Sequence, residues 1–379
     1  MQLVDDARGL ALACGALSRG DIFYLDTEFD SSREGTRLCL IQIGAGEEVF
    51  LLDPMAISDL TPLGRLLGAS GKTWVLHAGQ QDIALLSDRL GVGPARVFDT
   101  QIAWALVSIE HSTSLAYLKY RLLGLRGEKT HQADDWRRRP LPPTQLAYAA
   151  DDVAHLPALY RALLGRGDAL GRTEILFEAA AESLIPVFEA PTPLRIDAFR
   201  NAWQLEPEGQ AVLRFLIDWY NSLPEAEQEA APDIKGLFSI ASRRPRTLDE
   251  LAGLRAVPRR TVSSFGRPLV TGIVQAIGRA HSEEFLPIEP PPYATAPELL
   301  ASGWLEAARA EVCTELSMAP ELVLPSRLMR RLRDAAVSRG ELTGALDALS
   351  GWRKVLLDRP LAQKLERHGP LTAKRAEEA

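Results

Sequence analysis

Segments with the character of β-strands are confined to the first third of this chain of 379 residues. They are short runs rich in β-branched and aromatic residues, separated by polar turns, at residues 22–25 (IFYL), 37–44 (RLCLIQIG), 48–52 (EVFLL), 73–78 (TWVLHA) and 96–99 (RVFD). The first three follow one another through short turns, which predicts three consecutive antiparallel strands. Helical stretches precede the last two. The order βββαβαβ therefore predicts a mixed α/β sheet in which three antiparallel strands are joined to parallel ones.

Helical spacing of apolar residues dominates the rest of the chain. Residues 80–91 predict a helix that ends in a glycine, and residues 144–165 predict a long helix with Thr144 as its N-cap. The C-terminal half has no strand pattern and is predicted to be all-helical. The segment 285–297 contains five prolines and no helical period, which indicates a linker.

These patterns divide the chain into an α/β domain, a helical connector, two helical units with a linker between them, and a tail. The predicted ranges are, in that order, 1–170, 171–204, 205–284, 285–297 for the linker, 298–370 for the second helical unit and 371–379 for the tail.

Composition fits a soluble chain. Hydrophobic residues make up 46% and charged residues 25% of the sequence, as in ordinary globular proteins, and there is no run of about 18 apolar residues that could span a membrane. The acidic start MQLVDDARGL does not resemble a signal peptide. The three cysteines form no CxxC pair, which favours a reducing compartment. We therefore expect a cytoplasmic protein.

The charge distribution leaves nucleic-acid binding open. The net charge is −7, from 43 basic and 50 acidic residues, and an acidic balance by itself disfavours binding to nucleic acid. Basic residues are nevertheless clustered at 118–129, 135–141, 242–246 and 258–260. Each cluster is either a solvated helix face or part of a nucleic-acid-binding surface.

Two carboxylates lie at the end of the first predicted strand. In IFYLDTEFD (22–30), Asp26 and Glu28 are two residues apart, so strand alternation places them on one face of the sheet. Adjacent carboxylates repel each other unless a hard cation neutralises them, which indicates a divalent metal site. Acidic pairs at this spacing are also common by chance, so the assignment needs further residues.

Further polar residues accompany this pair. Asp82 lies in the first turn of a predicted helix, where a carboxylate can also simply stabilise the helix dipole. Tyr148 and Asp152 are four residues apart on another predicted helix, so a phenol and a carboxylate share one helix face. The neighbouring Asp151 lacks this spacing to Tyr148, although it can influence the titration of Asp152.

The ordered set of Asp-x-Glu on a first strand, Asp at a helix start and Tyr-x-x-x-Asp on a long helix resembles the DEDD exonuclease superfamily. The resemblance is to the tyrosine-bearing branch, and within it to the ribonuclease D family. The matching stretches are FYLDTEFD, RLCLIQIG, HAGQQDIALL, VFDTQIAWAL, SLAYLKYRLLG, EKTHQADDWRRRPL and QLAYAADDVAHLPALY, within about residues 22–165. The resemblance implies a ribonuclease-H-like fold that releases 5′-mononucleotides from an RNA 3′ end with two divalent metal ions, Mg²⁺ or Mn²⁺.

The resemblance also implies roles for individual residues. Asp26 would bridge both ions, and Asp82 would support the second. Glu28 and Asp152 would hold the ion with the attacking water, and Tyr148 would orient that water. Substrate-binding positions implied in the same way are Thr27, Phe29, Gln42, His77, Lys129, Gln132 and Arg139. Alternatives remain for three of these residues. Phe29 could pack in the core, Gln42 could bind a backbone group, and His77 could have no chemical role.

The helical half carries a second resemblance. Residues 236–277 resemble an HRDC domain, and residues 297–367 resemble a divergent second copy. The basic residues expected to dock RNA there are Arg243, Arg244, Arg246, Arg259 and Arg260. The resemblance implies RNA 3′ ends and tRNA precursors as substrates, and a monomer that needs no ATP, since the sequence contains no P-loop.

Three alternatives stay open. The enzyme could act on DNA, because no residue identifies a reader of the RNA 2′-hydroxyl group. The chain could instead be an RNA-binding scaffold without turnover, although the four acids and Tyr148 are all present. The helical half could serve only dimer contacts or solubility.

Overall fold

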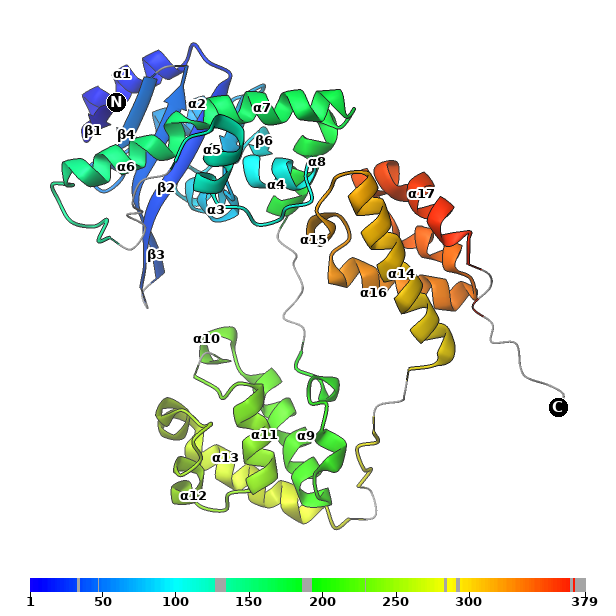
Figure 1. The fold of residues 1–379 in the computed structure, drawn as a ribbon. Coiled ribbons are helices and arrows are strands. Elements are labelled where there is room, and N and C mark those ends of the chain that lie inside the picture. Colours follow the sequence, from blue (N-terminus) through cyan, green and yellow to red (C-terminus); the bar gives the residue numbers. More distant parts are fainter. Residues whose placement is uncertain are drawn as a thin grey trace. The chain divides into compact units, whose positions relative to one another are not determined.

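The computed structural model describes residues 1–32, 35–46, 48–126, 134–185, 193–228, 230–282, 285–290, 294–368 and 371. The chain forms two compact units (Figure 1). Unit 1 combines Met1–Pro186 with Thr295–Ala379, and unit 2 is Val187–Ala294.

Unit 1 contains a six-stranded mixed sheet with the order β1-β4-β3-β2-β5-β6. Its strands are β1 (Gln2–Val4), β2 (Ile22–Ser32), β3 (Gly35–Ala45), β4 (Glu48–Leu52), β5 (Thr73–Leu76) and β6 (Arg96–Asp99). β3 is antiparallel to β2 and β4, whereas β1 pairs with β4, and β5 with β2 and β6, in parallel. The predicted mixed sheet is confirmed. The structure adds β1, which has too few residues to show a strand pattern.

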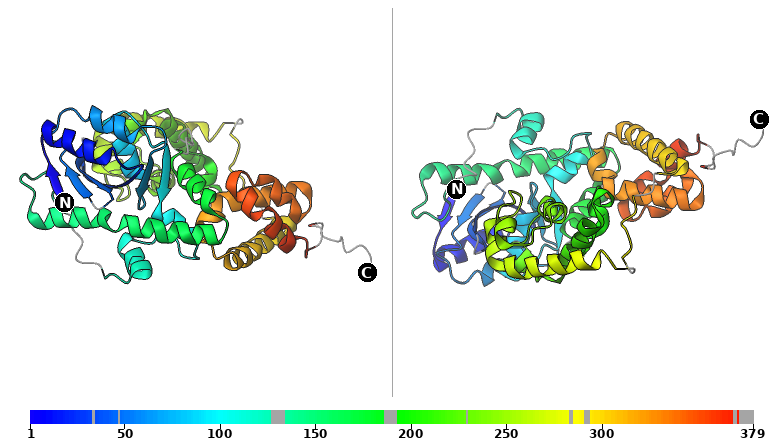
Figure 2. Two further views of the ribbon diagram at one scale, coloured as in Figure 1. Left: turned by 90° about the horizontal axis from the view of Figure 1, so that it is seen from above. Right: turned by 90° about the horizontal axis from the view of Figure 1, so that it is seen from below.

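Helices cover both faces of the sheet. The first group is α1 (Ala7–Leu17), α2 (Thr61–Leu67) and α3 (Gln80–Leu90), and the second is α4 (Thr100–Ala105), α5 (Leu115–Leu123), α6 (Pro143–Ala154), α7 (Leu156–Ala169) and α8 (Thr173–Leu184). Figure 2 shows α6 and α7 along one face and α1 on the other. Phe23 and Leu25 of β2 pack with the first group, and Tyr24 packs with the second. Alternation therefore directs Asp26 and Glu28 toward α6 and Thr27 toward α3.

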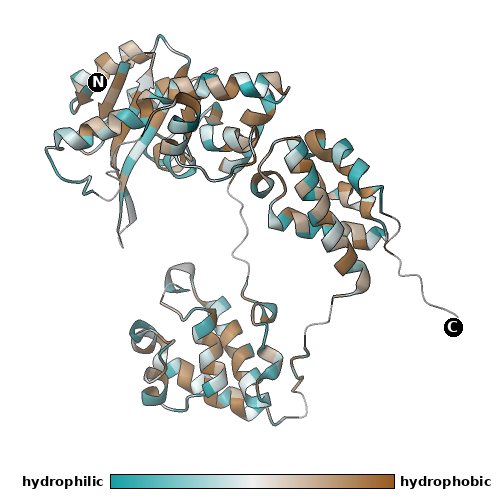
Figure 3. Ribbon diagram, in the orientation of Figure 1, coloured by the Kyte–Doolittle hydropathy of each residue, from teal (hydrophilic) through white to brown (hydrophobic). Residues whose placement is uncertain are grey.

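The strands are apolar where they cross the core, and the far ends of β2 and β3 are hydrophilic (Figure 3). A register shift between Glu28 and Phe29 marks the change. Such bulges bend a strand and are frequent beside active sites. Here the bulge directly follows the carboxylate pair.

The helix predicted over 144–165 is in fact two helices. α6 and α7 meet at His155. Pro157 lies in the first turn of α7 and has no N–H to donate to the preceding turn, so the helical hydrogen-bond ladder is interrupted there. α6 also begins at Pro143 rather than after Thr144 as N-cap, because the fixed φ of proline suits a first helical turn.

The C-terminal helices belong to the core of unit 1. They are α14 (Ala296–Glu315), α15 (Pro320–Val323), α16 (Ser326–Arg339), a 3₁₀ segment at Leu342–Ala348 and α17 (Gly351–Leu365), and they share one apolar cluster with α4–α8. The buried Arg172 donates to the backbone oxygens of Leu106 at 2.8 Å and Leu316 at 2.7 Å. Arg353 of α17 donates to the Glu182 carboxylate of α8 at 2.6 and 2.7 Å. Residues 295–368 and Leu371 therefore pack as part of unit 1.

Unit 2 is helical and has its own core. It contains 3₁₀ turns at Ile196–Ala198 and Ala202–Gln204, followed by α9 (Pro207–Ser222), α10 (Glu225–Gln228), α11 (Ile234–Arg243), α12 (Leu248–Ala252) and α13 (Arg259–Arg279). Leu216, Leu237 and Ile273 lie at the centre of its apolar cluster. The predicted helical character of the C-terminal half is confirmed. Among the helices described here, none is both long and apolar enough to cross a membrane.

Candidate active site

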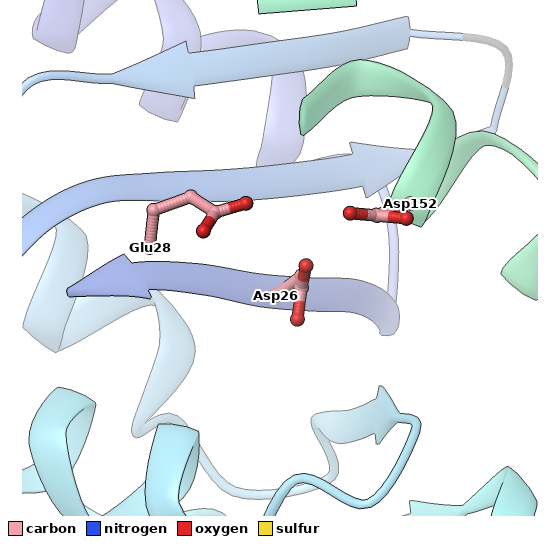
Figure 4. A group of neighbouring side chains, drawn as sticks. All are labelled: Asp26, Glu28 and Asp152. Carbon is pink, nitrogen blue, oxygen red and sulfur yellow. The ribbon is translucent and has the colours of Figure 1, made fainter. Parts of the chain in front are cut away.

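Three carboxylates converge above the sheet. Asp26 and Glu28 come from β2, and Asp152 comes from α6, which covers this face of the sheet (Figure 4). Each offers an oxygen atom, and these atoms all lie within 4.8 Å of one another. The strand alternation and the helix together thus bring these three predicted acids into one group, which we call the acid cluster.

Asp82 approaches the acid cluster from the other side of β2. It lies in the first turn of α3 and is 9% exposed. The Thr27 hydroxyl donates to its Oδ1 atom, because Thr27 points toward the α3 face of the sheet. Asp82 is near enough to Asp26 to raise the pKa of that carboxyl group. The Thr27 hydroxyl therefore supports an acid, and the contact with substrate that the resemblance implied for Thr27 stays a prediction.

The acids share one electrostatic environment. Burial, followed by repulsion from Asp152, Asp82 and Asp134, raises the pKa of Glu28 to about 8. Burial raises the pKa of Asp152 to about 6, against the opposing effects of Tyr148 and Lys119. Burial and the surrounding carboxylates raise the pKa of Asp26 well above its usual value. Ionised carboxylates in this arrangement are unfavourable without a compensating positive charge.

Tyr148 lies one helical turn before Asp152 on α6, and its hydroxyl forms a hydrogen bond with the Asp152 carboxylate. The phenol ring packs near the buried Trp136, with 6.3 Å between ring centroids. Burial and the nearby carboxylates raise the pKa of Tyr148. The phenol therefore stays protonated and acts as a hydrogen-bond donor.

Gln42 lies beside the acid cluster, directly opposite Asp26 in the sheet register. It is fully buried, and its Nε2 atom is 3.5 Å from Glu28 Oε1, to which it donates. Within the part of the chain that the structure describes, its Oε1 atom has no hydrogen-bond partner. Phe29, the other predicted position on these strands, is half-buried and follows the bulge.

The guanidinium of Arg139, predicted to contact substrate, makes its hydrogen bonds within the protein. Its Nε and Nη2 atoms bind the Asp53 carboxylate at 2.5 and 2.8 Å, and Nη2 also donates to the Cys39 oxygen at 2.8 Å. Nη1 donates to the backbone oxygens of Trp136 and Arg138 at 2.7 and 2.9 Å. These bonds use all five N–H groups of the guanidinium. Arg139 thus fastens the loop that carries Trp136 to the sheet.

His77 is likewise engaged in structural bonds. Its Nδ1 atom is 2.9 Å from the Thr100 hydroxyl, and its Nε2 atom is 3.0 Å from the Thr113 backbone oxygen. Both ring nitrogens are occupied, which disfavours the substrate contact and fits the alternative of a position outside the chemistry. The other two predicted positions, Lys129 and Gln132, lie outside the described residues.

Sequence reasoning missed one charged residue near the acid cluster. Lys119 of α5 belongs to the basic cluster at 118–129, but it is 6% exposed and forms an ion pair with Asp151. Its charge lowers the pKa of Asp152, while Asp151 raises it. A lysine that faces inward has no sequence signal of its own, because the surrounding basic residues suggest a solvated helix face.

Comparison with known proteins agrees with this geometry. Residues 1–167 match the model of a 3′-5′ exonuclease family. Ribonuclease D of Pseudomonas paraeruginosa is 32% identical, over 97% of this chain and 98% of the relative. Ribonuclease D of Escherichia coli is 28% identical, also over 97% of this chain and 98% of the relative. The crystal structure of Escherichia coli RNase D, described as an exoribonuclease involved in structured RNA processing, aligns with a TM-score of 0.70 and 26% identity, over 97% of this chain and 99% of the other.

The mixed sheet, its acid cluster and the family match together define a 3′–5′ exonuclease. The similarity to ribonuclease D of Pseudomonas paraeruginosa covers nearly the full length of both chains, so it includes the helical regions as well as the α/β domain. The chain belongs to the ribonuclease D family of 3′→5′ exoribonucleases. The predicted resemblance is confirmed, and neither a DNA exonuclease nor a scaffold without turnover is favoured.

Proposed function

We propose that this enzyme shortens structured RNA, including tRNA precursors, by releasing 5′-mononucleotides from the 3′ end. Two divalent metal ions, Mg²⁺ or Mn²⁺, would be held by Asp26, Glu28, Asp82 and Asp152. The acid cluster, with its oxygen atoms within 4.8 Å of one another, is the observation that carries the proposal. The three cysteines are free, which supports a cytoplasmic enzyme, and we propose that it acts as a monomer without ATP.

The residues present fit divalent metal ions. The donors are carboxylate oxygens, which suit hard cations such as Mg²⁺ and Mn²⁺ rather than softer metals. Burial, together with the charge of neighbouring carboxylates, raises the pKa values of Glu28 and Asp152, and bound cations would favour the ionised form of both groups. The buried Oε1 atom of Gln42, which lacks a donor among the described residues, leaves an acceptor available for ordered water at the site.

The chain's own residues orient the reaction. Bound divalent ions lower the pKa of water and neutralise charge on the departing 3′ oxygen. The protonated Tyr148 hydroxyl lies beside Asp152 and orients the attacking water, but its raised pKa makes it unsuited to remove a proton. The hydrogen bond with Tyr148 and the charge of Lys119 keep the pKa of Asp152 below the value that burial alone would give, so Asp152 would be an ionised ligand at neutral pH.

We propose that unit 2 is an HRDC-type module that docks the body of the RNA. Four exposed arginines lie at the end of α11, in the segment that follows it and at the start of α13: Arg243, Arg246, Arg259 and Arg260. Arg244 is partly withdrawn from this set, since its Nε atom is 3.4 Å from the Glu208 carboxylate. Exposed arginines bind phosphates with release of counterions, and this makes affinity dependent on salt.

The acid cluster predicts that stability in the absence of metal falls as the pH rises. Glu28 retains a proton in the folded state up to about pH 8, whereas an unfolded glutamate loses it near pH 4.3, roughly. Its stabilising effect is therefore fully present below the unfolded pKa and is lost as the pH rises through the folded pKa.

Calorimetry in EDTA tests this linkage. At pH 8, Glu28→Gln should melt several degrees above the wild type, and the difference should shrink at pH 5. Addition of Mn²⁺ should raise the melting temperature of the wild type more than that of the variant. Equal melting curves at both pH values would contradict the predicted charge repulsion.

Replacing unit 2 with a flexible Gly/Ser linker should separate docking from cleavage. Cleavage of a short single-stranded RNA should stay within about threefold, since the acid cluster and the core of unit 1 are retained. Binding to tRNA should weaken, and the slope of log K against log salt should fall by about 0.7 to 0.9 for each lost phosphate contact. Truncation after residue 185 should instead destabilise the protein, because it also removes α14–α17 from the core of unit 1.

A charge-matched pair refines this test. Arg259→Gln with Arg260→Gln should lower the salt slope, whereas Arg330→Gln with Arg331→Gln, which removes equal charge from exposed positions of α16, should not. Equal slopes for all proteins would mean that unit 2 does not dock RNA.

The substrate is tested with a tRNA that carries extra 3′ residues and with single-stranded RNA and DNA of the same sequence. Incubated with Mg²⁺ or Mn²⁺, the tRNA should lose its extra residues one at a time, and RNA should be shortened faster than DNA. Equal rates on RNA and DNA would refute the proposed substrate class.

A further inference from the structure

The turn between β5 and α3 places Asp82 at the acid cluster. Ala78, in this turn, has a φ of +53°, a left-handed conformation that residues with a side chain rarely adopt. Gly79 follows it as the N-cap of α3, without a side-chain cap. A Cβ atom at Gly79 would lie 2.5 Å from the Cβ atom of Leu76. The turn is therefore tight and requires contacts from elsewhere to keep its shape.

The carboxylate of Asp99 makes these contacts. Asp99 ends β6 and is 6% exposed. Its Oδ1 atom accepts the Ala78 N–H at 3.1 Å, and its Oδ2 atom accepts the Gly79 N–H at 2.9 Å. Oδ1 also caps α4 by accepting the N–H groups of Gln101 at 2.8 Å and Ile102 at 3.2 Å. One buried side chain thus serves four backbone donors in two separate turns.

A second set of bonds joins the same elements. The Thr100 hydroxyl lies 2.9 Å from His77 Nδ1 and donates to the Leu76 backbone oxygen at 3.1 Å. The turn after β5 and the turn after β6 therefore form one hydrogen-bonded assembly. The Thr27 hydroxyl of β2 donates to the Asp82 carboxylate. Asp82 is therefore held in place by the first turn of its helix and by β2.

We infer that Asp99 is a positioning residue for Asp82, because its carboxylate holds the turn at 77–79 from which α3 presents Asp82 to the acid cluster. The inference rests on the proposed role of Asp82 as a metal ligand. Residues behind metal ligands commonly set the geometry of the site without touching the metal. Asp99 does so through the backbone rather than through the ligand's own side chain.

Asp99→Ser separates the two functions of the side chain. Serine is a good N-cap, so it retains a cap for α4, but its side chain is too short to reach Ala78 and Gly79. The Mn²⁺ concentration for half-maximal cleavage should rise by about 10- to 100-fold, as when residues behind metal ligands are removed. At saturating Mn²⁺, kcat should stay within about threefold of the wild type. Calorimetric titration with Mn²⁺, without RNA, should show the same loss of affinity.

Two further variants complete the test. Asp99→Asn keeps the contacts of Oδ1 and loses the acceptor for Gly79, so its shift should be intermediate. Asp6→Ala removes the N-cap of α1, which accepts the Gly9 N–H at 2.6 Å in the same unit. It should lower the melting temperature without changing the Mn²⁺ dependence.

The outcomes distinguish this inference from the proposed function. Asp82→Asn should weaken Mn²⁺ binding, and if it does not, the proposed metal site fails. If Asp82→Asn weakens binding but Asp99→Ser only lowers the melting temperature, the metal site stands and Asp99 is not a positioning residue.

Discussion

Asp26→Asn should lower the turnover number by several orders of magnitude while leaving RNA affinity within about tenfold. Asp26 belongs to the acid cluster, and its pKa is raised by burial and by Asp82, Asp152 and Glu28. An amide of the same size removes a charged ligand and leaves the contacts with the RNA backbone in place.

Single-turnover cleavage and filter binding measure these two quantities on the same labelled RNA. Asp88→Asn, an exposed position on α3, is the matched control and should retain the wild-type rate. If Asp26→Asn retained that rate too, Asp26 would not be a ligand of the catalytic metal.

Tyr148→Phe should slow cleavage by about 10²- to 10⁴-fold, the range for one positioned polar group. The ring still packs near Trp136, so the loss isolates the hydroxyl bonded to Asp152. The melting temperature should change little. Affinity for Mn²⁺ should also change little, since a protonated phenol is not a metal ligand.

Tyr120→Phe provides the control. It makes the same chemical change at a residue that is 53% exposed and that does not belong to the acid cluster. Wild-type cleavage by Tyr148→Phe would exclude Tyr148 from orienting the water. Slow cleavage with lost Mn²⁺ affinity would instead assign it to the metal site.

Strand periodicity was sufficient to predict much of the fold and part of the site. Alternation along β2 places Asp26 and Glu28 on one face, and four-residue spacing on α6 places Tyr148 beside Asp152. These relations are local, because they depend only on the repeat of a strand or a helix. The glycine expected at the end of α3 is Gly91, with a φ of +69°, and this too is a local effect.

The relations that sequence reasoning missed depend on contacts between distant segments. Arg139 and Asp53 are 86 residues apart, and Arg172 and Leu316 are 144 apart. In the sequence, a polar residue that binds substrate cannot be distinguished from one whose hydrogen-bond donors are bonded inside the protein. For the same reason, the helical pattern at 298–370 gives no sign that these helices share a core with α4–α8.

The most direct test of the acid cluster is a time course with RNA labelled at its 5′ end, in Mn²⁺ and in EDTA. We expect the wild type with Mn²⁺ to produce a ladder that shortens one nucleotide at a time from the 3′ end, and we expect neither the wild type in EDTA nor Asp26→Asn to do so. An equal ladder in EDTA, or cuts within the RNA, would contradict a metal-dependent 3′→5′ exoribonuclease built on Asp26, Glu28 and Asp152.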